Sequence, residues 1–203
     1  MLDKKRTLSI LKIFAARAGA EMERKRTETA MRDMAYHDAL TGLPNRILLH
    51  DRLEMALLQA NRNNSLVGLL YIDFDRFKQV NDTLGHDVGD KLLQEVGNRL
   101  KDCLRQQDTV ARLGGDEFIL LLPEISNSED AGSLAQKLLD TVRPPIFIGE
   151  HELNITLSIG IGLYPLDGKN SKSLIKCADE ALYLAKDSGR DCYKYYKPTT
   201  SAE

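Results

Sequence analysis

Residues 111–122, ARLGGDEFILLL, place two glycines and two acids between two runs of strand-like sequence. Thr109–Leu113 is predicted as one strand, and Phe118–Leu122 is an unbroken apolar run, which is typical of a strand buried on both faces. Gly114 and Gly115 tolerate backbone angles that other residues avoid, so a tight hairpin fits between the strands. These residues can form either a functional acidic turn or a plain polar β-turn, and the rest of the chain has to decide between the two interpretations.

Acidic side chains stand at the ends of two predicted strands. Asp116 and Glu117 precede the buried run, and Asp73 follows a second buried strand, Leu66–Ile72. If the two strands are neighbours, these carboxylates converge at one edge of the sheet and repel unless one is protonated or a metal is bound. Mg²⁺ prefers oxygen ligands and often binds a couple of carboxylates together with substrate phosphates. The alternative is that Asp73 and Asp75 only cap the end of a strand.

The composition describes an ordinary globular protein. The 203 residues are 42% hydrophobic and 29% charged, with a net charge of −2, so neither a nucleic-acid polymer nor an anionic membrane is an expected partner. The three cysteines form no metal-type pair and are read as core thiols in a reducing compartment. No apolar run has transmembrane length and no signal peptide is visible, so we expect a cytoplasmic chain without membrane insertion.

Residues 1–35 are predicted to form a separate N-terminal linker helix, followed by the main domain at 36–203. The segment holds nine Lys and Arg against five Asp and Glu, with no Pro. A heptad seam passes through Ile10, Ile13 and Met31, but Arg17 and Arg24 fall on the same seam. A solvated linker helix therefore explains the pattern at least as well as a coiled coil does.

The main domain alternates helices and strands. Asn45 is the predicted N-cap of its first helix, and Ser126 with Glu129 is the predicted capping box of a later one. The predicted elements are helix 46–60, strand 66–72, a polar loop at 79–90, helix 92–104, strands 109–113 and 118–122, helix 129–142, a hairpin of 146–148 with 153–162, helix 174–185 and strand 191–196. Because consecutive hairpins exclude a purely parallel sheet, we expect an α+β fold with a mostly antiparallel sheet of about five strands and flanking helices.

Six motifs occur in this chain in a recognisable order. They are DALTGLPNR (38–46), DFDRFK (73–78), ND (81–82), GHDVGD (85–90), RLGGDEF (112–118) and KDSGR (186–190). Over residues 36–197 the chain resembles the GGDEF domain, the catalytic domain of diguanylate cyclases, without a departure at a catalytic position. The resemblance implies a palm-like fold similar to nucleotide cyclases and some polymerases. Residues 11–24 are loosely similar to the closing helix of GAF domains, so we expect a fragment of a larger sensor protein.

The resemblance also implies a reaction. Each domain would hold one GTP, and in a homodimer the 3′-hydroxyl of each GTP would attack the α-phosphorus of the other, giving cyclic di-GMP and two pyrophosphates. Two Mg²⁺ per active site, with Mn²⁺ as a substitute, would be held by Asp73, the carbonyl of Phe74, Asp116 and Glu117. Asp116 would also be the base for the attacking hydroxyl, and Lys78 would offset charge on the phosphates.

The remaining substrate contacts follow from the same resemblance. Asn81 and Asp90 would read guanine, His86 would line the pocket, and Lys186 and Arg190 would reach the terminal phosphates. A carboxylate at Asp90 can accept from guanine N1–H and N2–H, a pair of donors that adenine lacks. The alternatives are that Asp90 is the N-cap of the following helix, that His86 is a structural loop histidine, and that the two cations only complement a helix C-terminus.

Arg105-x-x-Asp108 has the spacing from Gly114 that marks the inhibitory product site in this family, although most such tetrapeptides are surface ion pairs. Arg143 is a candidate for a second arginine of that site. A binding module that holds cyclic di-GMP or GTP without turnover is the main rival hypothesis, and a cyclase using both ATP and GTP is a weaker one.

Overall fold

The structure is a computed structural model that describes residue 14, residues 17–27 and residues 34–198. The chain divides into two units, residues 1–37 and residues 38–203, which are described separately. In the first unit, the described residues at 14, 17–27 and 34–36 are helical. Ile10, Ile13 and Met31 of the predicted heptad seam lie outside the described residues.

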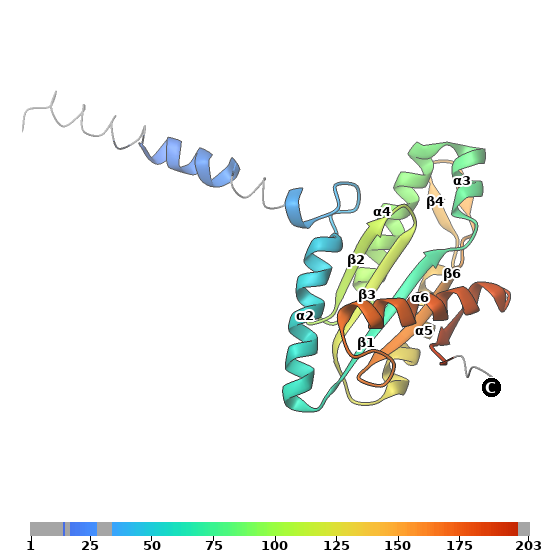
Figure 1. The fold of residues 1–203 in the computed structure, drawn as a ribbon. Helices are drawn as coiled ribbons and strands as arrows, with labels where there is room; N and C mark the ends of the chain where they lie inside the picture. Colours follow the sequence, from blue (N-terminus) through green and yellow to red (C-terminus); the bar gives the residue numbers. More distant parts are fainter. Residues whose placement is uncertain (1–13, 15–16, 28–33, 199–203) are drawn as a thin grey trace, which may run out of the picture. The chain divides into compact units, whose positions relative to one another are not determined.

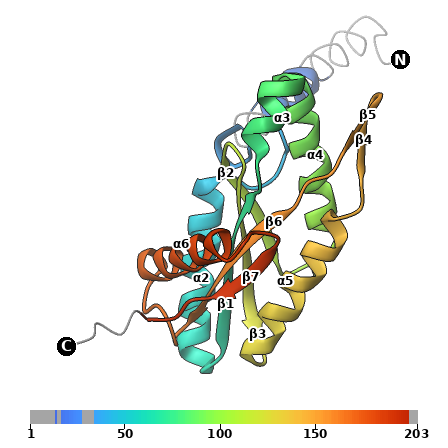
Figure 2. The ribbon, with the colours of Figure 1, turned by 90° about the vertical axis from the view of Figure 1, so that its right-hand side faces the viewer.

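The second unit is built on a five-stranded sheet, shown in Figures 1 and 2. Its elements are α2 (Arg46–Asn63), β1 (Leu66–Phe74), α3 (Phe77–Leu84), α4 (His86–Asp102), β2 (Thr109–Gly114), β3 (Glu117–Ile125), α5 (Ser128–Val142), β4 (Ile146–Ile148), β5 (His151–Leu153), β6 (Leu157–Tyr164), α6 (Ser171–Asp187) and β7 (Cys192–Tyr195). The strand order is β2-β3-β1-β6-β7, and only the β6–β7 pair of this sheet is parallel. The predicted α+β fold with a mostly antiparallel sheet is confirmed.

Strand β1 lies at the centre of the sheet and is buried on both faces. Its alternate residues Leu70, Ile72 and Phe74 pack with α4 and α5 on one face. The intervening residues Val67, Leu69 and Tyr71 pack with α2 and α6 on the other face, and Figure 2 shows the sheet between these two helix pairs. Burying a large apolar side chain contributes about 1.5–3 kcal/mol, so a strand covered twice requires the unbroken apolar run seen in the sequence.

Two helix starts show how local sequence sets the element boundaries. Asn45 caps α2, as predicted, since its side chain accepts from the main-chain N–H groups of Ile47 and Leu48. The predicted capping box of α5 is wrong by one residue: Asn127 is the N-cap and Asp130 is its partner. The Asn127 side chain accepts from the Asp130 N–H at 3.0 Å. Asparagine and serine are equally good N-caps, so residue preference alone could not distinguish Asn127 from Ser126.

The predicted polar loop at 79–90 is wrong. The segment folds into α3 and the start of α4, which are separated by Gly85 with a φ of 86°. Phe77, Val80 and Leu84 have helical spacing and pack on the core, but α3 is only eight residues long, so this pattern is too short to distinguish a helix from a loop in the sequence.

The second predicted hairpin is also paired differently. Strands β4 and β5 form a small two-stranded sheet of their own, with Ile146 opposite Leu153. Leu157–Tyr164 is a separate strand, β6, which joins the central sheet beside β1. No helix in the described part of the chain is both long and apolar enough to span a membrane.

Candidate active site

The acids at the ends of β1 and β3 come together. The two strands are antiparallel neighbours, which is the condition under which the acids were expected to converge, and Asp73 lies directly opposite Glu117 in their register. Burial raises the pKa of Asp73, hydrogen bonding to Lys186 opposes that rise, and the nearby charge of Asp116 raises the pKa further. Burial also raises the pKa of Tyr71, and the adjacent Glu117 carboxylate adds to the effect. Three carboxylates therefore gather at the edge of the sheet.

Two cations at the C-terminal end of α6 lie beside the acids Asp73 and Asp75 at the end of β1. Lys186 lies in the last turn of the helix, and its Nζ is 2.8 Å from Asp73 Oδ1. Arg190 follows the helix, and its Nε is 3.9 Å from Asp75 Oδ1. Because α6 packs against β6 and β1, its C-terminus is carried to the same sheet edge as the carboxylates.

The ring of Phe74 anchors this end of β1 in the core. It stacks on Phe118 with ring centroids 5.3 Å apart and meets Phe77 edge-on at 5.9 Å. The residue is 1% exposed, so its ring is committed to the core. Lys78, the second residue of α3, is exposed near the same strand end.

The predicted guanine-binding residues lie on α3 and α4. Asn81 is on α3, His86 is the first residue of α4, and Asp90 is on the exposed face one turn later. Gly85 is the N-cap of α4, so the alternative in which Asp90 caps this helix is wrong. The Oδ1 atom of Asn81 is buried without a hydrogen-bond partner, and a Cβ added at Gly89 would collide with it. An unpaired buried acceptor is costly, which marks this amide as a group suited to a ligand donor.

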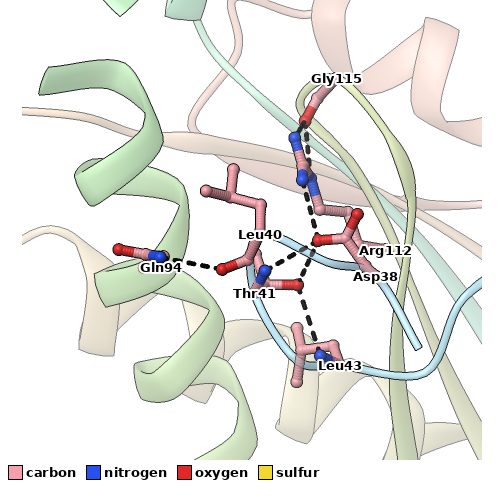
Figure 3. Close-up of polar contacts among 7 residues, drawn as sticks. All are labelled: Asp38, Leu40, Thr41, Leu43, Gln94, Arg112 and Gly115. Atoms are coloured by element: carbon pink, nitrogen blue, oxygen red, sulfur yellow. Dashed lines mark hydrogen bonds and ion pairs between the residues drawn. The ribbon is translucent and has the colours of Figure 1, made fainter. Parts of the chain in front are cut away.

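Arg112 and Asp38 form a link that the sequence motifs contained but did not explain (Figure 3). Asp38 Oδ1 accepts from Arg112 Nη1 at 2.9 Å and from Thr41 N at 2.9 Å and Oγ1 at 2.7 Å. The same guanidinium donates twice to the carbonyl of Gly115, at 3.0 and 2.8 Å. The 38–43 segment is thereby tied to the turn that carries Asp116.

Arg105 and Asp108 sit in the turn between α4 and β2. The Arg105 N–H donates to Asp108 Oδ2 at 3.0 Å, and the Asp108 N–H donates to the Arg105 carbonyl at 3.1 Å. Burial raises the pKa of Asp108, and the bond and charge of Arg105 counter that rise. Both residues line a cavity of about 470 Å³ that Lys137 also borders. Arg143 is not among its lining residues; it pairs instead with Asp191 at 3.1 Å.

The site can also be judged as a metal centre. Within residues 34–198 and the shorter described stretches, no three His, Cys, Asp or Glu side chains are grouped as a ready metal-binding set. The Asp73 carboxylate pairs with Lys186 instead, at 2.8 Å. The oxygen donors at this edge nevertheless match the ligand preference of Mg²⁺.

Comparison with known proteins gives a consistent result. The family model described as "Diguanylate cyclase, GGDEF domain" matches residues 35–192. The bifunctional diguanylate cyclase/cyclic di-GMP phosphodiesterase MucR of Pseudomonas aeruginosa is 46% identical over 194 residues, covering 96% of this chain and 27% of MucR. The cyclic di-GMP phosphodiesterase PdeR of Escherichia coli is 38% identical, with 92% of this chain and 28% of PdeR covered. The chain thus spans less than a third of the length of these relatives.

Solved structures agree with the sequence comparison. The GGDEF domain of TpbB (YfiN) from Pseudomonas aeruginosa is 40% identical and superposes with a TM-score of 0.78, covering 79% of this chain and 94% of that one. The coiled coil and GGDEF domain of DgcB from Caulobacter crescentus, in complex with c-di-GMP, is 27% identical with a TM-score of 0.80, covering 91% and 98%. With its fold, its ordered motifs and these relatives in agreement, the chain belongs to the GGDEF family of diguanylate cyclase domains.

Proposed function

We propose that this chain condenses two molecules of GTP into cyclic di-GMP and two pyrophosphates. The observation that carries the proposal is the juxtaposition of Asp73 and Glu117 across two strands, with Lys186 2.8 Å from Asp73. Family membership alone does not decide the activity, because the relatives include both a named cyclase and a named phosphodiesterase. A complete set of acids and cations at the sheet edge favours catalysis over a purely structural role.

Mg²⁺ would be held by Asp73, the carbonyl of Phe74, Asp116 and Glu117, with two ions per site and Mn²⁺ as a substitute. Burial raises the pKa of Asp73 and the charge of Asp116 raises it further, so a divalent cation bound here would stabilise the ionised carboxylates. When bound, the metal supplies positive charge to the phosphates and polarises the reacting oxygens.

The side chains of the chain would divide the remaining work. Asp116 accepts the proton of the attacking 3′-hydroxyl, and Lys78 offsets charge that develops on the α-phosphate. Lys186 and Arg190 bind the terminal phosphates. Their position beside Asp73 and Asp75 supports this assignment, because the same cations can turn toward phosphate when a metal takes over the carboxylate.

Guanine would be held between α3 and α4 by Asn81 and Asp90, with His86 lining the pocket. The buried, unpaired Oδ1 of Asn81 supports this placement, since it offers an acceptor to the amino edge of the base. Asp90 is exposed and does not cap α4, so its carboxylate is available to the base.

The proposed enzyme works as a homodimer. One site with one GTP cannot close the ring, because each 3′-hydroxyl has to reach the α-phosphorus of the other nucleotide. We further propose that Arg105 and Asp108 bind product and inhibit turnover, in the cavity of about 470 Å³ that they line. The guanidinium can engage phosphate or guanine acceptors in a bidentate manner.

The test is product formation from GTP and Mg²⁺, followed by chromatography over a range of protein concentrations. Copurified nucleotide is first removed with a cyclic di-GMP phosphodiesterase. We expect product to rise more steeply than linearly with protein and to vanish in Asp116→Asn. A wild-type chain that binds GTP but forms no product, even when dimerisation is forced by a fused coiled coil, would establish the rival function of a nucleotide receptor.

A further inference from the structure

Asp75 lies two residues beyond Asp73 and is more buried than the carboxylates assigned a role above. Its side chain is 3% exposed, compared with 15% for Asp73. Its main-chain N–H donates to the Thr156 carbonyl at 2.9 Å, so the chain after β1 runs beside the segment that precedes β6. A carboxylate buried this deeply is costly unless donors surround both of its oxygens.

Three hydrogen bonds satisfy that carboxylate. Thr156 Oγ1 donates to Oδ2 at 2.6 Å, and Ser158 Oγ donates to Oδ1 at 2.7 Å. The third donor is the main-chain N–H of Asp191, at 3.1 Å from Oδ2. Thr156 directly precedes β6 and Ser158 is its second residue, whereas Asp191 belongs to the turn between α6 and β7. Asp75 therefore connects the start of β6 to the turn at Asp191, which is 116 residues from Asp75 in sequence.

That turn has an unusual backbone. Gly189, Arg190 and Asp191 have φ values of 109°, 66° and 46°, which all lie in the left-handed range. For a residue with a side chain this conformation costs about 1–2 kcal/mol, so two in succession require outside support. The bond from the Asp191 N–H to Asp75 is one support, and the pair of the Asp191 carboxylate with Arg143 at 3.1 Å is another.

The turn presents Arg190. Its guanidinium Nε lies 3.9 Å from Asp75 Oδ1, which is too long for a hydrogen bond. The side chain is 49% exposed and borders a cavity of about 370 Å³ together with Gln79 and Thr156. Asp75 thus lies near Arg190 without accepting a hydrogen bond from it. The N–H donors of the Arg190 guanidinium stay available to an anion.

We propose that Asp75 is a positioning residue, which holds the Gly189–Asp191 turn so that Arg190 faces the terminal phosphates of GTP. The inference rests on the proposed function, because it assumes that Arg190 binds substrate. The two acids of β1 then have different tasks. Asp73, paired with Lys186, is the one that a metal can recruit, whereas Asp75 is fully bonded and serves the turn.

The test is a double-mutant cycle on the binding of 3′-deoxy-GTP, which lacks the attacking hydroxyl. Calorimetry with Mg²⁺ compares the wild-type chain, Asp75→Asn, Arg190→Ala and the double variant. Asparagine keeps the shape but removes the negative charge, so its hydrogen bonds with the two hydroxyls and the Asp191 N–H are no longer charge-assisted and are weaker. We expect each single variant to bind about tenfold more weakly, and the double variant to lie within about twofold of Arg190→Ala.

The outcomes separate the inference from the proposed function. Equal losses from Asp75→Asn in both backgrounds, or no loss at all, would overturn the positioning role, because a merely structural effect does not depend on Arg190. A wild-type chain that fails to bind the nucleotide would overturn the proposed function and the inference together. Thermal unfolding monitors the fold, and if Asp75→Asn does not fold, Thr156→Val with Ser158→Ala replaces it in the same cycle. That double substitution removes the two hydroxyl hydrogen bonds to the Asp75 carboxylate and is expected to show the same coupling to Arg190.

Discussion

Arg112 Nη1 lies 2.9 Å from Asp38 Oδ1, across 74 residues of sequence. The side chains are 9% and 20% exposed, so the pair is largely withdrawn from water. Because the same guanidinium also holds the Gly115 carbonyl, one side chain fixes the start of the domain to the turn that carries Asp116. We therefore expect both the stability of the fold and the geometry of the site to depend on this contact.

Arg112→Met is expected to lower the free energy of unfolding by about 2–4 kcal/mol, because it leaves the Asp38 carboxylate buried without its cation. It should also lower the rate of cyclic di-GMP formation, since the turn before Asp116 loses two hydrogen bonds. Urea unfolding and initial rates measure the two effects. Lys176→Gln, which breaks an exposed pair with Glu180, is the control and should cost at most about 1 kcal/mol. Equal stability losses in the two variants would contradict the role given to Arg112.

The same pair predicts a pH dependence of stability. Burial raises the pKa of Asp38, but the hydrogen bonds from Thr41 and Arg112 outweigh it, so the pKa lies below its ordinary value. The contribution is therefore complete above the unfolded pKa, about 3.9, and is lost as the pH falls through the folded pKa. The difference in unfolding free energy between wild type and Asp38→Asn should be constant near neutral pH and shrink below about pH 4. A difference that grows on acidification would show that the carboxylate is not stabilised by its partners.

Gly89→Ala tests the proposed guanine-binding residues. A Cβ at this position would displace the amide of Asn81, so we expect the Michaelis constant for GTP to rise about tenfold and the preference for GTP over ATP to fall. Gly97→Ala is a matched control on the same helix: its Cβ would approach Leu43 Cδ1 at 3.2 Å, far from the amide. Both substitutions raise the intrinsic helix propensity by about 1 kcal/mol. A difference in kinetics between the two variants therefore cannot come from helix propensity. Similar kinetics in the two variants would remove Asn81 from the recognition of the base.

The strands were predictable because burial on both faces leaves a local signature. β1 and β3 each read as an apolar run, and the acids at their ends followed once the strands were taken as neighbours. Helix α3 is only eight residues long, so the helical spacing of Phe77, Val80 and Leu84 is too short a pattern to identify it. The pairing of β4 with β5 rather than with β6 could not be decided from the sequence, since all three segments have strand character.

The positioning contacts were hidden for a different reason. The donors to Asp75 lie 81, 83 and 116 residues away, and the partner of Arg112 lies 74 residues away, so no local spacing relates them. The motifs contain these residues, but a motif does not say which of its members face the ligand. Only the folded arrangement distinguishes Asp73 at the open edge from Asp75 behind it.

Arg105→Ala is expected to raise the cyclic di-GMP concentration needed for half-inhibition by about tenfold or more, because the guanidinium supplies the charge-assisted bonds of the proposed product site. The turn itself should survive, since Asp108 bonds to the main chain of residue 105 rather than to its side chain. Lys101→Ala removes an exposed cation from the last turn of α4 and is the control. Inhibition that is unchanged in Arg105→Ala, measured as initial rates with added product, would place the product elsewhere.

If Asp73 holds a divalent cation as proposed, Lys186 and the cation compete for its carboxylate, and this predicts opposite effects on metal and nucleotide binding. Lys186 Nζ lies 2.8 Å from Asp73 Oδ1. A metal ion that binds the nucleotide-free protein therefore has to displace the ammonium group from the carboxylate. In Lys186→Met the carboxylates lose that partner, and Mn²⁺ should bind several-fold more tightly without nucleotide, while 3′-deoxy-GTP should bind about tenfold more weakly. Electron paramagnetic resonance of free Mn²⁺ gives the first value and calorimetry the second. Lys176→Gln, on the same helix but paired with Glu180, should change neither. If Lys186→Met weakens Mn²⁺ binding as well, the lysine supports the metal site instead of competing with it.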